Sequence, residues 1–342
     1  MESVKILHTA DIHLRDKNGE AQAKAFADII TLAQEHKPHM LLIAGDLFDS
    51  GFESKSEKSY MVSLLSKIPD IPVFMVAGNH DSLPCYKDIT LPENVHLFGS
   101  EMGKVSLDGV DVYGISMSAN YSRESLVEDF RVDDNSKINI LLLHGDLDAS
   151  SAYNPFTSTQ LSQTGADYVA LGHVHTTKGI GKAGSVHYAY AGVPQGRGFD
   201  ELGTKGVWIG HVHKGYVDLK QYPTCEYTYE EVNVDVSSLS DYQQIAHRIR
   251  ECTDANNCYK IHLTGNFAGD FAINGDRVVN LLDDYRLVKI YDDTGDAPDL
   301  DVIKNEQSLR GFFVASLIND PDGAEAIKYG LAALDGKEIN VL

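Results

Sequence analysis

The sequence predicts an α/β protein whose first part is built on a parallel sheet. Within residues 1–80, three short β-rich runs alternate with two stretches that have the apolar spacing of helices. Strands that alternate with helices in this way favour a parallel sheet with right-handed crossovers. Each run is followed at once by a short polar motif, and such sheets bind ligands beyond the carboxyl ends of their strands.

Apolar spacing and breaker residues define the elements of this first part. Phe26, Ile29 and Ala33 recur at the spacing of one helix face, and Pro38 ends that helix. A second helix follows the same logic around Met61 and Leu65. The predicted strands span residues 4–9, 39–44 and 72–77, and the predicted helices span residues 20–37 and 56–67.

The chain becomes richer in β-structure after residue 90, and Pro223 then marks a domain boundary. Short apolar runs predict strands at residues 95–98, 105–107, 110–115, 138–143, 168–171 and 186–191, followed by a hairpin over residues 206–222. Strands and helices then alternate to residue 291, and two helices are expected at residues 305–318 and 322–334. We therefore expect a first domain over residues 1–222, a small α/β domain over residues 225–298 and a helical segment over residues 302–342.

The composition is that of an ordinary globular protein with a strongly acidic balance. Of the 342 residues, 43% are hydrophobic, and no apolar run approaches the roughly 20 residues of a membrane span. No secretory leader is recognisable and the four cysteines are scattered, so we expect a cytoplasmic protein with reduced thiols. The net charge is −21, whereas chains that grip DNA phosphates by themselves usually carry a basic face.

Five motifs of acidic residues, histidine and asparagine occur in order, each after a strand-like run. Asp, Asn and His side chains are ligands of hard and borderline divalent cations. The motifs hold more such ligands than one cation needs, which predicts two metals side by side, and paired metals carry out in-line displacement at phosphorus. The motifs are Asp11-Ile12-His13, Gly45-Asp46, Gly78-Asn79-His80-Asp81, His144-Gly145-Asp146 and Gly172-His173-Val174-His175.

The spacing indicates how some of these ligands act. Asp11 and His13 are two residues apart at a strand end, so their side chains point the same way. Asp46 ends the neighbouring strand, where a carboxylate can bridge two metals, and Asn79 offers a neutral amide oxygen. A Gly-His-x-His string recurs at residues 210–213, but it falls inside the predicted hairpin and is interpreted as structural.

The order D-x-H, G-D, G-N-H-[DE], H and G-H-x-H resembles that of the calcineurin-like metallophosphoesterase superfamily over about the first 220 residues. The resemblance implies an α/β/β/α sandwich with two divalent metal ions, most often Mn²⁺, although an N/O donor set also suits Zn²⁺, Fe or Mg²⁺. It implies that one metal is held by Asp11, His13, Asp46 and His175, and the other by Asp46, Asn79, His144 and His173.

The same resemblance gives roles to residues beside the ligands. His80 would face the scissile phosphate, as general acid or hydrogen-bond donor, and would not bind metal. Asp49 stands where relatives carry the residue that orients this histidine; a solvated loop carboxylate is the alternative. Ser50 stands where phosphoprotein phosphatases carry a phosphate-binding arginine, which argues against that class. Arg197 is interpreted as a loop cation that is solvated, with a phosphate contact as the alternative.

The opening residues 8–14 (HTADIHL) and the layout after Pro223 look like those of SbcD-type bacterial DNA-repair nucleases, including the YhaO-like exonucleases. This resemblance implies a Mn²⁺-dependent DNA exonuclease or endonuclease in DNA repair, with a capping domain and an SMC-like ATPase partner; a homodimer is left open. The alternatives are a phosphodiesterase that acts on small nucleotides or other phosphodiesters, and a non-enzymatic, metal-bound scaffold of a repair complex.

The predicted tail helices carry apolar residues at helical spacing. Such a face either packs inside the protein or docks a coiled-coil-bearing ATPase by helix-in-groove contacts. We expect one side of the first helix to present Leu309, Phe312, Phe313 and Leu317, and the next helix to present Ile327, Leu331 and Leu334.

Overall fold

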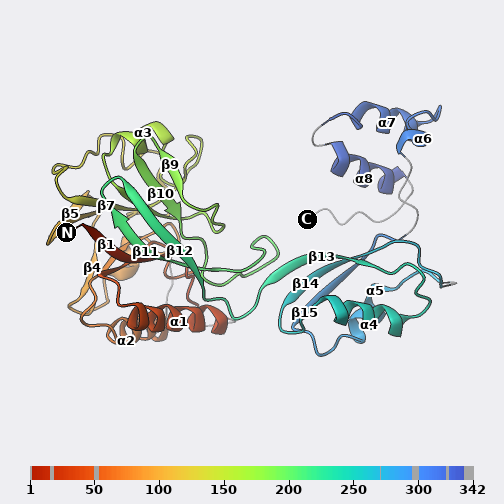
Figure 1. Ribbon diagram of the computed structural model, residues 1–342, viewed down its shortest axis with the longest axis horizontal. Helices are drawn as coiled ribbons and strands as arrows, with labels where there is room; N and C mark the ends of the chain where they lie inside the picture. Colours follow the sequence, from red (N-terminus) through yellow and green to blue (C-terminus); the bar gives the residue numbers. More distant parts are fainter. Residues whose placement is uncertain are drawn as a thin grey trace. The chain divides into compact units, whose positions relative to one another are not determined.

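The computed structural model describes residues 2–15, 19–49, 54–269, 271–294, 300–320 and 323–334 (Figure 1). The chain divides into two compact units, Met1–Glu230 and Glu231–Leu342. This division falls inside the strand Tyr229–Asp235, shortly after Pro223. We retain the three-part division at residues 1–222, 225–298 and 302–342 as a proposal for the domain limits.

The first unit is a sandwich of two six-stranded sheets. The first sheet has the order β12-β11-β1-β2-β3-β4, and the second has the order β5-β6-β7-β8-β10-β9. The first sheet consists of β1 (Ser3–Thr9), β2 (Met40–Ala44), β3 (Val73–Val76), β4 (Val95–Leu97), β11 (Gly206–His213) and β12 (Tyr216–Pro223). The second consists of β5 (Gly103–Leu107), β6 (Val110–Gly114), β7 (Ile138–His144), β8 (Tyr168–Gly172), β9 (Gly181–Ala183) and β10 (Val186–Tyr190).

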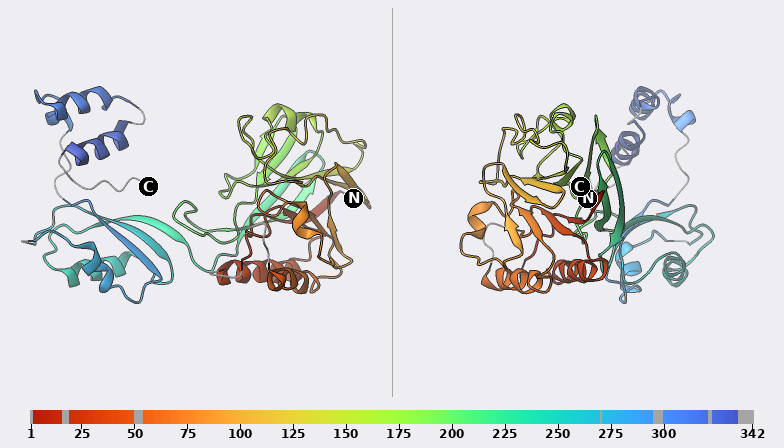
Figure 2. Two further views of the ribbon diagram at one scale, coloured as in Figure 1. Left: turned by 180° about the vertical axis from the view of Figure 1, so that it is seen from behind. Right: turned by 60° about the vertical axis from the view of Figure 1, so that its left-hand side comes forward.

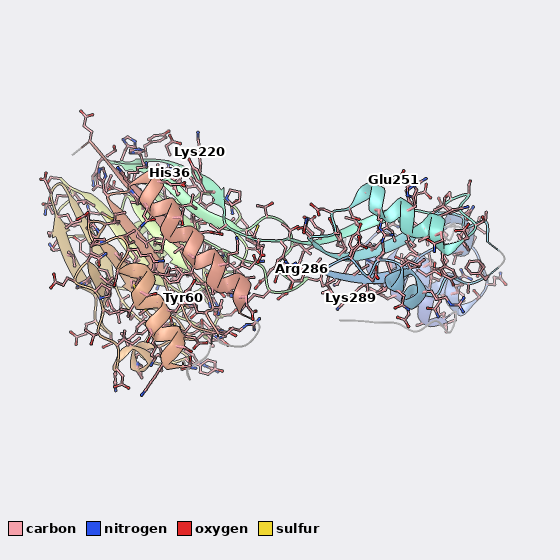
Figure 3. The ribbon with its side chains drawn as sticks, turned by 90° about the horizontal axis from the view of Figure 1, so that it is seen from below. His36, Tyr60, Lys220, Glu251, Arg286 and Lys289 are labelled. Atoms are coloured by element: carbon pink, nitrogen blue, oxygen red, sulfur yellow. The ribbon has the colours of Figure 1, made fainter. Side chains whose placement is uncertain are left out.

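Helices cover the outer faces of the sandwich and confirm the predicted α/β/β/α fold class. On the first sheet, α1 (Glu20–His36) and α2 (Lys55–Leu65) lie side by side (Figures 2 and 3). The hydroxyl of Tyr60 in α2 donates to the carbonyl oxygen of Ala23 in α1 at 2.8 Å. On the second sheet, α3 (Ser158–Gln163) packs through Leu161.

Burial on both faces explains why the central strands read as continuous apolar runs. Every residue of β2 and of β7 is buried. Leu42 of β2 and Leu142 of β7 belong to the core between the two sheets, whereas Leu41 and Ile43 pack on the other face with Phe26 of α1. The first sheet therefore packs against the second sheet on one face and against α1 and α2 on the other.

Short capping motifs define where two of the helices begin. The hydroxyl of Ser54 accepts from the backbone N–H of Glu57, whose carboxylate accepts from the N–H of Ser54. Thr157 and Gln160 form the same reciprocal pair before α3. The sequence prediction omitted α3, although Thr157-x-x-Gln160 was a readable start signal.

Parallel pairing brings several strand ends to one edge of the sandwich. In the first sheet, Thr9 of β1 pairs with Ile43 of β2, and Ala44 pairs with Val76 of β3. In the second sheet, β7 and β8 run parallel, with His144 opposite Gly172. The residues that follow these ends are the five polar motifs.

The second unit contains a small sheet with the order β13-β14-β15, in which β14 and β15 are parallel. Ile245 and Ile249 of the first helix and Val278 of the second pack with Ile261 and Leu263 of the central strand. The elements are β13 (Tyr229–Asp235), α4 (Tyr242–Cys252), β14 (Cys258–Thr264), α5 (Gly275–Asn280) and β15 (Leu287–Asp292).

The described residues of the tail form three helices, α6 (Leu300–Ile303), α7 (Leu309–Leu317) and α8 (Gly323–Leu334). The first predicted tail helix therefore starts too early. Ser308 caps α7 by accepting from the N–H of Gly311, which sets the start at residue 309. No helix in the described part of the chain combines the length and the apolar character of a membrane-spanning helix.

The expectation that one side of α7 presents all four apolar residues was wrong. Phe313 and Leu317 pack beside Ile327 and Leu331 of α8, whereas Leu309 and Phe312 are 72% and 70% exposed. Successive residues are about 100° apart around a helix, so Phe312 and Phe313 do not face the same neighbour.

Candidate metal centre

The seven predicted ligands converge at the strand ends described above. Three overlapping groups each have ligand atoms within 4.8 Å of one another: Asp11, His13 and His175; His13, Asp46 and His80; and Asp11, Asp46 and His144. The side chains of Asp11, His13, Asp46 and His144 are almost completely buried. Buried carboxylates are stable only when they are paired or coordinated.

One half of the cluster contains Asp11, His13 and His175. Nε2 of His13 lies 3.2 Å from Nε2 of His175. Two ring nitrogens at this distance are close enough to bind the same cation. Both oxygens of Asp11 accept from the backbone N–H of His173 at 3.0 Å, which holds this carboxylate in place.

The other half is organised around the amide oxygen of Asn79. Oδ1 of Asn79 lies 2.9 Å from Nε2 of His144 and 2.9 Å from Nδ1 of His173. Oδ2 of Asp46 lies 3.4 Å from Nε2 of His144 and 4.0 Å from Nε2 of His13. Asp46 therefore lies between the two halves, and the oxygen and nitrogen donors fit two divalent cations.

The backbone at these positions is unusual. Asp11, His13, Asp46 and His173 have φ values of 52°, 53°, 50° and 100°. Each such residue costs on the order of 1–3 kcal/mol and persists where the surroundings impose it. The N–H groups of Asp11 and His13 donate to the carbonyl oxygens of Gly45 and Asp46, which ties the β1 end to the β2 end.

Two glycines of the motifs lie so close to neighbouring side chains that no larger residue fits at their positions. A Cβ atom at Gly45 would overlap the imidazole of His144, and a Cβ atom at Gly78 would overlap the carboxylate of Asp46. Gly45 also has a φ of 89°. The glycines in Gly-Asp and Gly-Asn-His therefore allow neighbouring ligands to meet.

Burial and charge set the protonation of the cluster. Burial lowers the pKa of His13 and of His173 to about 4, so both rings are neutral at pH 7. Burial opposes charge on His144 as well, but Asp46 and Asp11 outweigh it and raise the pKa of His144 to about 9. Burial also raises the pKa of Asp46, but the nearby His144 and His13 outweigh it and hold that pKa below its ordinary value.

His80 lies at the partly exposed edge of the cluster. Its Nδ1 is 2.7 Å from the backbone carbonyl oxygen of Asp49, and because a carbonyl only accepts, Nδ1 donates and Nε2 remains for another partner. The carboxylate of Asp49 lies 3.2 Å from Nδ1 of His13 instead. Asp49 thus contacts His80 through its backbone and not through its carboxylate.

Two residues near this edge were missed or misread from the sequence. The buried carboxylate of Glu201 lies 2.7 Å from Nδ1 of His175 and also accepts from Arg197. Arg197 donates in addition to Oδ1 of Asp49 at 3.1 Å. The interpretation of Arg197 as a solvated cation was therefore wrong. Glu201 belongs to no recognisable motif, because its contact with His175 joins residues that are distant in the sequence.

Asp81 is not a proposed ligand, but its side chain connects the loops that carry Asp46 and Asn79. Its buried carboxylate accepts from the backbone N–H of Leu47 at 2.7 Å and of Gly78 at 2.7 Å. It also accepts from the hydroxyl of Tyr86, which belongs to a short 3₁₀ helix, η1 (Leu83–Tyr86). Asp81 therefore joins the loops that follow β2 and β3.

The second Gly-His-x-His string lies elsewhere. His211 and His213 pair with Lys5 and Ser3 in the sheet, at the end of β1 opposite to Asp11. The structure does not bring these two rings to the metal centre.

Residues 4–177 match the family model of the calcineurin-like phosphoesterases. The chain is 27% identical over 277 residues to the uncharacterized metallophosphoesterase YhaO of Bacillus subtilis. The aligned region covers 73% of this chain and 68% of YhaO. The chain is 25% identical over 307 residues to a subunit of the nuclease SbcCD of Staphylococcus epidermidis, covering 76% and 79%. It is 28% identical over 193 residues to the DNA double-strand break repair protein Mre11 of Sulfolobus acidocaldarius, covering 51% and 50%.

Solved structures also resemble the chain at low identity. A dimetal phosphatase from Danio rerio superposes with a TM-score of 0.46 at 10% identity, covering 65% of this chain and 96% of the other. The protein TT1561 of Thermus thermophilus superposes with a TM-score of 0.42 at 11% identity, covering 64% and 98%.

Proposed function

Since the chain belongs to the calcineurin-like phosphoesterase family and is a metal-dependent phosphoester hydrolase, we propose that it is a Mn²⁺-dependent DNA nuclease. It would cut phosphodiester bonds as an exonuclease or endonuclease in cytoplasmic DNA repair. The similarity to proteins named as a nuclease subunit and as a break-repair protein supports this substrate. The observation that supports the proposal is the clustering of Asp11, His13, Asp46, His144 and His175. Asn79 contacts His144 and His173 beside this cluster.

The residues divide into two proposed metal sites. Two bound cations would supply Lewis-acid stabilisation at phosphorus and activation of water. Asp46 would contribute to both sites, as its position between His13 and His144 supports. Asp11, His13 and His175 would complete one site, and Asn79, His144 and His173 the other.

His80 is proposed as the group that meets the leaving oxygen. Its ring is held through Nδ1, so that Nε2 is the atom available to a substrate. A nitrogen of His80 also lies within 4.8 Å of ligand atoms of His13 and Asp46, which makes metal binding the competing role. Asp49 would position His80 through its carbonyl oxygen and His13 through its carboxylate.

A partner is proposed to supply affinity for DNA. The net charge of −21 opposes autonomous binding to a polyanion. Leu309 and Phe312 expose apolar surface on α7, which suits the docking of an SMC-like ATPase. A homodimer is the other assembly compatible with the proposal.

Parallel assays test this function. The full chain is incubated with Mn²⁺ and with labelled single-stranded DNA, duplex DNA or bis(p-nitrophenyl) phosphate. We expect cleavage of DNA and of the small diester, its loss in excess chelator, and its loss in Asp46→Asn. Cleavage of the small diester alone would replace DNA by a small phosphodiester as substrate. Undiminished turnover in chelator would overturn the two-metal centre.

A further inference from the structure

Two tyrosines extend a row of rings outward from the metal centre. The ring centroid of Tyr153 lies 4.9 Å from that of His173, at an interplanar angle of 38°. The ring of Tyr121 lies 5.4 Å from that of Tyr153, at 32°. The row therefore begins at a proposed metal ligand and ends at a side chain that is 67% exposed.

Asn154 connects the loops that carry Tyr121 and Tyr153 to β7, the strand that ends at His144. Ser122 and Tyr153 form an isolated β-bridge, and the N–H of Asn154 donates to the carbonyl oxygen of Ser122 at 2.8 Å. The buried side chain of Asn154 donates to the carbonyl oxygen of His144 at 2.9 Å and accepts from the N–H of Leu126 at 2.9 Å. Both tyrosine-bearing loops are thus anchored to one end of β7.

The ring of Tyr121 is largely exposed and contacts the ring of Tyr153. A single exposed aromatic residue is ordinary on a protein surface, but this ring is backed by Tyr153 and stands two ring contacts from the metal centre. Among the described residues, Tyr153 is the ring against which Tyr121 packs. A largely exposed aromatic ring that is held by a second ring offers surface on which planar unsaturated groups stack.

We propose that Tyr121, backed by Tyr153, is a stacking platform for a nucleobase of the strand whose phosphodiester lies at the metal centre. Nucleobases are the planar groups attached to nucleic-acid phosphodiesters, and every base offers a face for such stacking. The inference rests on the proposed DNA substrate and specifies it. A base inside a duplex already stacks on both sides, so the platform selects single-stranded or frayed DNA.

The cleavage test compares a single-stranded oligonucleotide with the same strand carrying abasic residues around the cleaved bond. We expect the wild-type Mn²⁺ enzyme to favour the intact strand by about 10-fold in kcat/KM. Tyr121→Ala should lose this preference and Tyr121→Phe should retain it. Tyr216→Ala is the matched control, because Tyr216 is also exposed but pairs with His213, at the far end of β1. An unchanged preference in Tyr121→Ala, or an equal loss on both strands, would overturn the platform.

A binding measurement separates the platform from the nuclease reaction. The full chain in excess chelator is titrated into a single strand that contains 2-aminopurine, whose fluorescence falls on stacking. Quenching by wild type and Tyr121→Phe, but not by Tyr121→Ala, is the expected result. Quenching without any cleavage in Mn²⁺ would leave the platform intact and reject the nuclease function. Equal quenching by wild type and Tyr121→Ala, or none by wild type, would reject the platform.

Discussion

Glu201 lies 2.7 Å from Nδ1 of His175, and this contact turns Nε2 of the same ring toward His13. Nη2 of Arg197 lies 3.1 Å from that Nδ1 as well. The carboxylate is the nearer group and only accepts, so Nδ1 carries the proton and Nε2 presents its lone pair. A ligand histidine held in this way is oriented and made more basic.

Replacing Glu201 should therefore weaken metal binding without touching a ligand. We expect Glu201→Ala to lower Mn²⁺ affinity by about 10–100-fold, and Glu201→Gln, which keeps an acceptor oxygen, to have a smaller effect. Calorimetric titration of chelator-treated protein measures both. Glu93→Ala removes an exposed carboxylate and should have no effect. An unchanged affinity in folded Glu201→Ala would show that the contact is only structural.

His80 and Asp46 should differ in what their replacement removes. His80→Gln should retain both metals and lose about 10²–10⁴-fold in turnover, because a general acid contributes on that scale. Asp46→Asn should lose metal, since Asp46 lies between both halves of the cluster. Metal content and turnover are measured on the same samples. If His80→Gln lost metal as readily as Asp46→Asn, His80 would be a ligand.

The clustering of the proposed ligands could be predicted from the sequence because each of their motifs lies at the end of a strand whose burial is visible as an apolar run. Met40–Ala44 leads to Asp46, and Ile138–His144 ends on the proposed ligand His144. Parallel strands share their carboxyl edge, so five local signals were enough to predict one site.

The supporting residues were not readable in this way. Glu201 and Arg197 occupy a loop without periodicity, and their contacts with His175 and Asp49 cross the chain. His80 contacts the backbone carbonyl oxygen of Asp49. Every residue has such an oxygen, so the sequence does not indicate which one will contact His80. Spacing in α7 likewise predicted apolar character but not which residue would meet α8.

Metal affinity should rise with pH because of His144. Burial lowers the pKa of this ring, but Asp46 and Asp11 outweigh it and raise that pKa to about 9. The metal-free ring is therefore protonated at pH 7 and must lose a proton to bind a cation. His13 and His173, with pKa values of about 4, are already neutral at pH 7 and release no proton there. Burial lowers the pKa of His175, but Glu201 and Asp11 outweigh it and raise that pKa, so His175 adds to the proton release.

We expect Mn²⁺ affinity to increase with pH below about pH 9, by about tenfold per pH unit for each proton that binding releases. Calorimetry in buffers of different ionisation enthalpy counts the protons that leave. A flat affinity over this range, with no proton release, would contradict the raised pKa of His144.

Adjacent phenylalanines of α7 should respond differently to truncation. The ring of Phe313 lies against Gly330 of α8, where a Cβ atom would overlap it, whereas Phe312 is 70% exposed. Phe313→Ala should lower the free energy of opening α7 and α8 by about 2 kcal/mol, less than for a fully buried phenylalanine. Phe312→Ala, the same change one position away, should alter it by less than about 0.5 kcal/mol. Hydrogen exchange of the backbone amides in both helices measures this difference, and equal protection in the two variants would mean that Phe313 does not hold the helices together.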